Sequence, residues 1–248
     1  MLMSIFPVVI LLNGCEGGNS AEEDQVQLRP RTEIVAQDEV VHYEISNDAN
    51  EVIGRGVLKT LLSADGVLTL VEEYYRVGET EATDTIETQV RRVDLTPLRG
   101  ERVVKQNSEA NIDSLNYNWS IQEFEGKEEL LRSYFVRSDK TGQDERIALA
   151  RQENVYANSS GIWLWRALPL DIGFKTNYMT VDSLNLKQQR VVLTVPQEES
   201  LVIGSKTYEV WRVLVRSGRA TRSAWIEKAA PNRVLRWDNG VTVMTVLE

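Results

Sequence analysis

The residues that could perform chemistry are few, and the first of them is His42, the single histidine of the 248-residue chain. A Ser-His-Asp or Cys-His arrangement needs an imidazole to carry a proton, so any such site would have to include this residue. His42 stands between Val41 and Tyr43, in an alternating stretch that is typical of a strand. We therefore interpret His42 as a strand or surface histidine and not as a general base.

Carboxylates are plentiful but are not spaced for catalysis or metal binding. The adjacent pairs Glu72-Glu73 and Glu198-Glu199 fall in stretches expected to be strands, where neighbouring side chains point to opposite faces. Such pairs cannot converge on one bond or one ion, and we interpret them as parts of solvated faces.

Histidine and cysteine residues lack the spacing of metal ligands. Gly54-Arg55-Gly56 lacks the third glycine of a dinucleotide loop, because Lys59 stands there. The sequence predicts no catalytic residue, no metal and no cofactor, so we do not expect an enzyme.

The N-terminus carries the strongest signal in the chain. Residues Ile5 to Leu12 form an apolar run that would span about 12 Å as a helix, against roughly 30 Å of bilayer hydrocarbon. This run is too short for a stable membrane span and suits the apolar part of a signal peptide. It leads into Leu12-Asn13-Gly14-Cys15, and Cys15 is the only cysteine, which excludes a disulfide within the chain.

The segment from Leu12 to Cys15 resembles a bacterial lipobox, with an aliphatic residue three positions before the cysteine and a small residue directly before it. The resemblance implies that the Cys15 thiol is lipidated, that the signal is cut before it, and that the lipid anchors the protein to a bacterial membrane outside the cytoplasm. Residues 16–24 are Gly, Asn, Ser, Ala and acidic residues, which suit a flexible tether. An ordinary cleaved signal with an incidental cysteine is the alternative.

We assign residues 1–14 to a signal peptide, 15–31 to a flexible polar tether and 32–248 to a single antiparallel β domain. The formal net charge of −9 argues against a nucleic-acid partner, because such binding uses clustered lysine and arginine to displace counterions. A net charge away from zero keeps an exported protein soluble, and we favour that explanation for the acidic composition.

From about Thr32 onward the chain has the pattern of strands. Val41, Tyr43 and Ile45 alternate with polar residues, which is the period of a half-buried strand. Asp65-Gly66 and Asn239-Gly240 separate β-rich runs, and these dipeptides favour tight hairpin turns. The sequence thus predicts consecutive antiparallel strands.

One central segment breaks this pattern. Residues 162–168 are expected to form one or two helical turns, which Pro169 ends. A sheet of this many strands cannot stay flat and open without exposing long edges. We therefore predict an all-β fold with minor α content: a strongly curled antiparallel sheet or open β-barrel, with a short helical segment near residues 159–168.

Several short motifs follow one another in a fixed order along the predicted domain. They are Ile53-Gly54 in an early strand, the central stretch Arg166 to Leu170, then Gly173, the late strand Tyr208 to Val215, Trp225, and the closing hairpin Arg233 to Leu247. This order is similar to that of a large group of exported bacterial proteins of unassigned function, over most of residues 35–248. The resemblance implies the curled antiparallel sheet of lipoprotein localisation factors and related lipid-carrying lipoproteins. It implies an architecture with a cavity and no catalytic residues.

Aromatic residues of the central segment are the candidate ligand-binding residues. Trp163 and Trp165 precede Leu168-Pro169-Leu170. If this segment lies across the mouth of the curled sheet, the two rings, Leu168 and Leu170 would line or cover an apolar cavity. The alternative, which we favour, is that the aromatic rings plug one end of the core.

Two functions remain open. The first is a lipoprotein that binds or carries an apolar ligand, such as a lipid acyl chain, inside the curled sheet. The second is a structural or assembly lipoprotein that holds a protein partner at the cell envelope through an exposed edge or loop. We favour the first, and the membrane is a partner of both through the lipid on Cys15.

Overall fold

Fifteen strands form one continuous sheet in the computed structural model. The structure describes residues 28–63, 65–108, 111–124, 128–137, 145–150, 155–182 and 187–248, with side chains at 28–63, 65–104, 155–181 and 188–248. The strands are β1 (Glu39–Asn47), β2 (Val52–Leu62), β3 (Val67–Arg76), β4 (Asp84–Arg91), β5 (Pro97–Ser108), β6 (Asn111–Phe124), β7 (Glu128–Arg137), β8 (Glu145–Ala150), β9 (Val155–Ala157), β10 (Lys175–Asp182), β11 (Lys187–Ile203), β12 (Lys206–Ser217), β13 (Ala220–Glu227), β14 (Val234–Asp238) and β15 (Thr242–Val246). The helices are the 3-10 turns η1 (Thr32–Ile34) and η2 (Asn158–Ser160) and the α-helix α1 (Gly161–Ala167).

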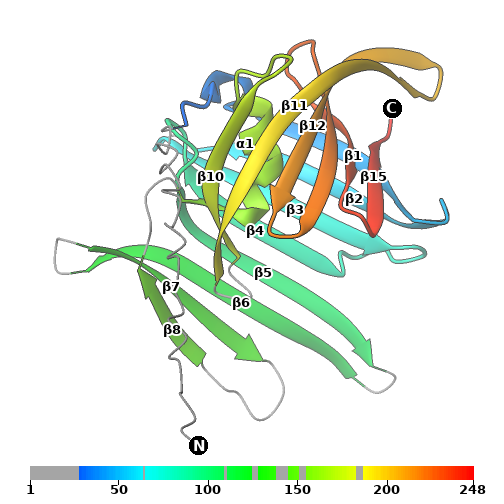
Figure 1. Ribbon diagram of the computed structural model, residues 1–248. Helices are drawn as coiled ribbons and strands as arrows, with labels where there is room; N and C mark the ends of the chain where they lie inside the picture. Colours follow the sequence, from blue (N-terminus) through cyan, green and yellow to red (C-terminus); the bar gives the residue numbers. More distant parts are fainter. Residues whose placement is uncertain are drawn as a thin grey trace, which may run out of the picture.

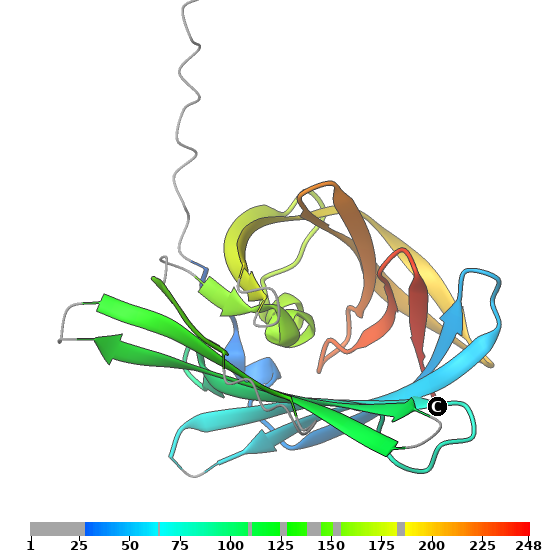
Figure 2. The ribbon, with the colours of Figure 1, turned by 90° about the horizontal axis from the view of Figure 1, so that it is seen from below.

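The sheet runs in the order β8-β7-β6-β5-β4-β3-β2-β1-β15-β14-β13-β12-β11-β10-β9. Pairing of β1 with β15 joins its two halves, and the parallel pair β9–β10 is the exception among antiparallel neighbours. Strands β9–β15 and β1–β5 curl into a nearly closed barrel around α1, as Figure 2 shows from below, and β9 returns alongside β5. Strands β6–β8 continue the sheet beyond the barrel (Figure 1). The predicted fold class, a curled antiparallel β-sheet with a short helix, is confirmed.

The local patterns produced the expected elements. Ser63 donates its amide to the Val67 carbonyl at 3.0 Å across the first predicted hairpin, where Gly66 has φ +81°. Gly240 has φ +87° in the second hairpin, between β14 and β15. Positive φ favours glycine at these turns, as the hairpin prediction required. His42 is exposed on β1, in agreement with its interpretation as a surface histidine.

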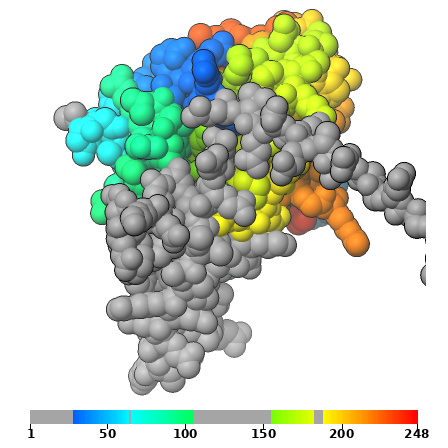
Figure 3. Space-filling model, turned by 60° about the vertical axis from the view of Figure 1, so that its left-hand side comes forward, coloured from blue at the N-terminus to red at the C-terminus, as the bar shows by residue number. Residues whose placement is uncertain are grey.

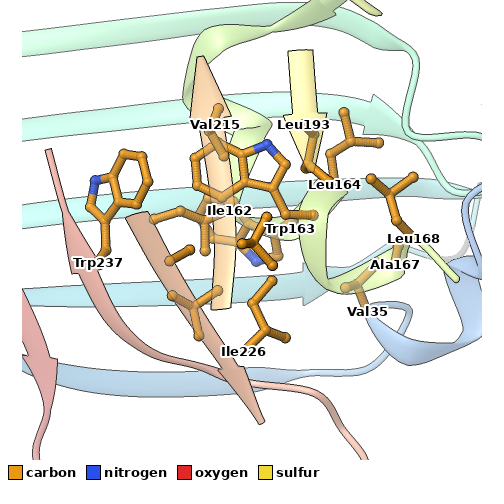
Figure 4. Packing of buried hydrophobic residues seen from close by; sticks show 14 of the residues in the cluster. Val35, Ile162, Trp163, Leu164, Ala167, Leu168, Leu193, Val215, Ile226 and Trp237 are labelled. Atoms are coloured by element: carbon orange, nitrogen blue, oxygen red, sulfur yellow. The ribbon is translucent and has the colours of Figure 1, made fainter. Parts of the chain in front are cut away.

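Helix α1 lies inside the barrel, and all seven of its residues are buried. A helix buried on every side needs apolar residues all around, which Ile162 to Trp165 supply. It ends at Leu168, whose extended backbone (φ −74°, ψ 152°) is the conformation favoured before proline. Figure 4 shows the packing around it, with Trp237 beside Ile162 at one end of the cluster and Val35 beside Ala167 at the other.

The chain that precedes η1 packs on the barrel earlier than expected. Leu28 is buried, and Arg31 donates its amide to the Ala167 carbonyl at 2.6 Å and its guanidinium to the Leu168 carbonyl at 3.0 Å. In the surface view of Figure 3, this blue segment lies between the green strands β4–β5 and the yellow-green residues 155–182. We placed the end of the tether at residue 31, and the structure places residues 28–31 on the packed body. The carbonyls at the end of α1 need donors, and Arg31 supplies them.

Gly54, one of the motif residues, is required by the neighbouring strand. A Cβ at this position would lie 2.3 Å from the backbone oxygen of Tyr75 in β3, whereas a Cβ at Gly56 would meet only side-chain atoms, at 3.6 Å or more. Gly54→Ala is expected to lower the free energy of unfolding by about 1–3 kcal/mol, because a backbone atom cannot rotate away. Gly56→Ala is the matched control, with a change below about 1 kcal/mol. Urea unfolding measures both, and equal effects would contradict the close approach at Gly54.

Candidate functional site

A cavity of about 410 Å³ lies at the N-terminal end of α1. Its walls come from β3–β5 on one side and from β10–β15 on the other, with η2 and α1 between them. The volume falls within the range of small-molecule sites, which is roughly 300–1,000 Å³. Closure of the sheet therefore leaves an internal space that could hold a ligand.

Aromatic and aliphatic side chains form one part of the cavity wall. The rings of Trp165 and Trp237 lie with centroids 4.7 Å apart at an angle of 44°. Ile162, Val191 and Val215 continue this apolar surface. An apolar surface of this kind can bury the hydrocarbon part of a ligand.

A buried carboxyl group lies on the opposite wall. Strand alternation turns Glu72 of β3 inward, where its side chain accepts a hydrogen bond from the Tyr74 hydroxyl at 2.5 Å. Burial raises the pKa of Glu72 to about 7, and the nearby Asp84 carboxylate adds to the rise. Arg102 neutralises Asp84 through two hydrogen bonds, of 2.8 Å from Nε and 2.5 Å from Nη2. Glu72 is therefore a group that changes its charge near neutral pH.

This pKa predicts how stability depends on pH. An ordinary glutamate has a pKa of about 4.5, so the stability that protonated Glu72 contributes is complete below that pH and is lost as the pH rises through about 7. Glu72→Gln is expected to be more stable than the wild type by about 1–3 kcal/mol at pH 8, with a small difference at pH 5. Urea unfolding at the two pH values measures this difference.

Glu73 provides the matched control for that prediction, since it is adjacent in sequence and points outward. Burial raises the pKa of Glu73, but hydrogen bonds from Lys59 (2.5 Å) and Tyr75 (2.7 Å) outweigh it and hold the pKa below its ordinary value. Glu73→Gln is expected to give no gain in stability at pH 8. A gain equal to that of Glu72→Gln would show that the buried carboxyl is not its cause.

Two further polar groups face the cavity from β10 and β13. The Tyr178 hydroxyl accepts a hydrogen bond from Trp165 Nε1 at 2.7 Å, and Tyr178 packs edge-on against Tyr156. The Nε atom of Arg222 is buried and has no hydrogen-bond partner in the described part of the chain. Polar side chains of η2 and of the last turn, Asn158, Ser159 and Asn239, also line the cavity, so its wall is apolar and polar in similar measure. Polar groups of this kind can orient a molecule whose apolar part lies against the aromatic surface.

The structure separates the four candidate ligand-binding residues. Trp165 lies on the cavity wall. Trp163 and Leu168 are fully packed in the core, and Leu170 is also buried there, so these three do not line the cavity. The central segment therefore contributes both to the core and to the cavity wall. Cys15, the predicted lipidation site, lies outside the described residues.

Sequence reasoning missed several of the cavity residues. The interpretation of Glu72 as part of a solvated face is wrong, because the residue is only 8% exposed. Its neighbour Glu73 lies on the opposite face of β3, with a side chain that is 17% exposed. The sequence does contain a pattern that could have identified Glu72 as inward-facing. Side chains alternate along a strand, so Glu72 shares one face with Leu70 and Tyr74. Arg222 and Tyr178 carried no such local signal.

The residues that the structure describes contain neither a cluster of metal ligands nor a membrane-spanning helix. Among these residues no three His, Cys, Asp or Glu side chains gather to hold a metal ion. None of the helices that the structure describes is long and apolar enough to cross a bilayer.

Comparison with known proteins identifies a shared fold. No protein-family model matches the chain, and no curated protein matches it either. The chain is similar to the crystal structure of a beta-barrel-like protein of the domain of unknown function DUF1849 from Brucella abortus, with a TM-score of 0.50 and 10% sequence identity. The match covers 86% of this chain and 97% of that one. At this identity the likeness concerns the fold alone, which is a barrel-like curled β-sheet also found in a bacterial protein of unknown function.

Proposed function

We propose that this protein is an exported lipoprotein, anchored to the cell envelope through Cys15, that binds a small ligand with an apolar body in the cavity of its barrel. The observation that carries the proposal is the cavity of about 410 Å³. Trp165 and Trp237 offer it an apolar wall, while Glu72 and Arg222 offer polar groups. A concave site that has an apolar surface for the body of a ligand and polar groups to fix its orientation is the usual form of a ligand pocket.

Binding is tested on protein purified from its bacterial host without detergent. Native mass spectrometry is expected to detect a co-purifying small molecule that is released on denaturation. Thr242→Trp places a large ring at a half-buried position of the cavity wall and is expected to abolish this mass, whereas Val202→Trp, at a position 67% exposed, retains it. The absence of any ligand from the wild type, with no binding on reconstitution, would overturn the proposal.

Anchoring is tested by replacing Cys15 with alanine. The wild type is expected to incorporate labelled palmitate and to sediment with membranes, and Cys15→Ala is expected to lose both properties, since the thiol is the acylated atom. A wild type that is unlabelled and remains in the soluble extracytoplasmic fraction would support an ordinary cleaved signal instead.

A second candidate function is the docking of an envelope protein on the free edge of the sheet. Within the described ranges, β8 pairs with β7 alone, so its other edge can accept a strand from a partner. Ile147→Pro removes a backbone donor from β8. Loss of a cross-linked envelope partner in this variant, with Thr242→Trp unaffected, would favour docking over ligand binding.

A further inference from the structure

We infer that the ligand ends in a carboxylate, which Arg222 and Tyr178 bind inside the cavity. The inference rests on the proposed function, since it names the chemical class of the molecule held at the same site.

Tyr178 has a donor that its surroundings leave unused. Its side chain is 5% exposed, and its hydroxyl oxygen accepts the Trp165 Nε1 hydrogen at 2.7 Å. That bond occupies a lone pair and leaves the hydroxyl proton free to donate. No acceptor for this proton is found in the described part of the chain. A buried donor without a partner is unfavourable, so a ligand oxygen at this position would be stabilised.

Arg222 supplies an unmatched positive charge on the wall of the same cavity. Its Nε is buried without a hydrogen-bond partner, and among the described residues no ion pair joins its guanidinium to a carboxylate. Arg222 and Tyr178 line the same cavity, and the charge of Arg222 opposes the rise that burial causes in the pKa of Tyr178. A planar guanidinium matches the two oxygens of a carboxylate.

The other charged groups of the cavity do not cancel this charge. Arg102 is paired with Asp84 on the opposite wall. Glu72 lies beside that pair and forms no ion pair with Arg222, and because burial raises its pKa to about 7 it is mostly uncharged below that pH. Arg222 therefore gives the cavity a preference for an anion. The apolar wall around Trp237 and Val215 is available to the rest of the molecule.

The experiment compares three probes with the same 12-carbon chain: dodecanoate, 1-dodecanol and dodecylamine. Isothermal titration calorimetry at pH 6.0, where Glu72 is mostly protonated, is expected to give the tightest binding for dodecanoate. Arg222→Gln is expected to weaken dodecanoate binding by about 10- to 100-fold, and Tyr178→Phe by about 3- to 10-fold, while dodecanol affinity stays within about twofold. Arg216→Gln, at an exposed position of β12, is the matched control and is expected to change neither affinity.

The outcomes separate this inference from the function on which it rests. Equal affinities for dodecanol and dodecanoate, with no loss in Arg222→Gln, would overturn the carboxylate assignment and leave the ligand-binding function standing. The tightest binding for dodecylamine would also overturn it, since Glu72 would then hold the head group. Failure of all three probes to bind the wild type would count against both proposals. Thermal unfolding of each variant confirms that the comparison is made on folded protein.

Discussion

Replacing Arg166 with methionine is expected to lower the free energy of unfolding by about 3–5 kcal/mol. The Arg166 side chain is 4% exposed and joins three parts of the barrel. Its Nη1 and Nη2 donate to the Glu39 carboxylate of β1 at 2.5 and 3.1 Å. Its Nε donates to the Asn232 carbonyl at 3.1 Å, and Nη2 donates to the Pro231 carbonyl at 3.0 Å. Methionine keeps the apolar contacts of the stem but leaves two carbonyls and the Glu39 carboxylate, whose side chain is 15% exposed, without their donors.

Urea unfolding followed by tryptophan fluorescence measures this loss. The double variant Arg166→Met/Glu39→Met is expected to be more stable than Arg166→Met alone, because the uncompensated charge is removed along with its partner. Arg91 and Asp94 form an ion pair in which the side chains are 49% and 39% exposed. Arg91→Ala therefore serves as the control and is expected to change stability by less than about 1 kcal/mol. An effect of Arg166→Met no larger than the control would contradict its bridging role.

Trp163→Ala is expected to lower the free energy of unfolding by about 3–5 kcal/mol, since it leaves a large cavity in the core. Trp163 is 1% exposed at the centre of α1, and its Nε1 donates to the Thr60 hydroxyl of β2 at 2.8 Å. Trp163→Phe keeps most of the volume but loses this hydrogen bond, with an expected cost of about 1–3 kcal/mol. Thermal unfolding and near-ultraviolet circular dichroism measure the loss of stability and of packing.

Trp211 provides the comparison for that prediction. It is half-buried on β12 and only packs against the edge of the core, so Trp211→Ala is expected to have a clearly smaller effect than Trp163→Ala. Equal effects at the two positions would mean that α1 does not occupy the centre of the core. Together with Arg166, this pair of variants tests how strongly the barrel depends on the helix that it encloses.

The candidate site illustrates where reasoning from local pattern failed. Period-two alternation in β3 correctly separates the faces of Glu72 and Glu73, but alternation does not say which face is inside. Glu72 is buried because the sheet curls toward that face and β9 and η2 close over it. Its pKa of about 7 follows from this burial and not from any feature of the residues beside it.

The sequence by itself determined the local elements: the alternating strands, the hairpins at Asp65-Gly66 and Asn239-Gly240, and the helical turns that end before Pro169. These depend on backbone sterics and on nearest-neighbour side chains, which a short window contains. Only the tertiary structure decided which groups meet in the cavity. Glu72, Tyr178 and Arg222 come from β3, β10 and β13, and the pairing of β1 with β15 brings these distant strands into one barrel. Contacts across such sequence separations depend on the register and curvature of the whole sheet, which no local pattern encodes.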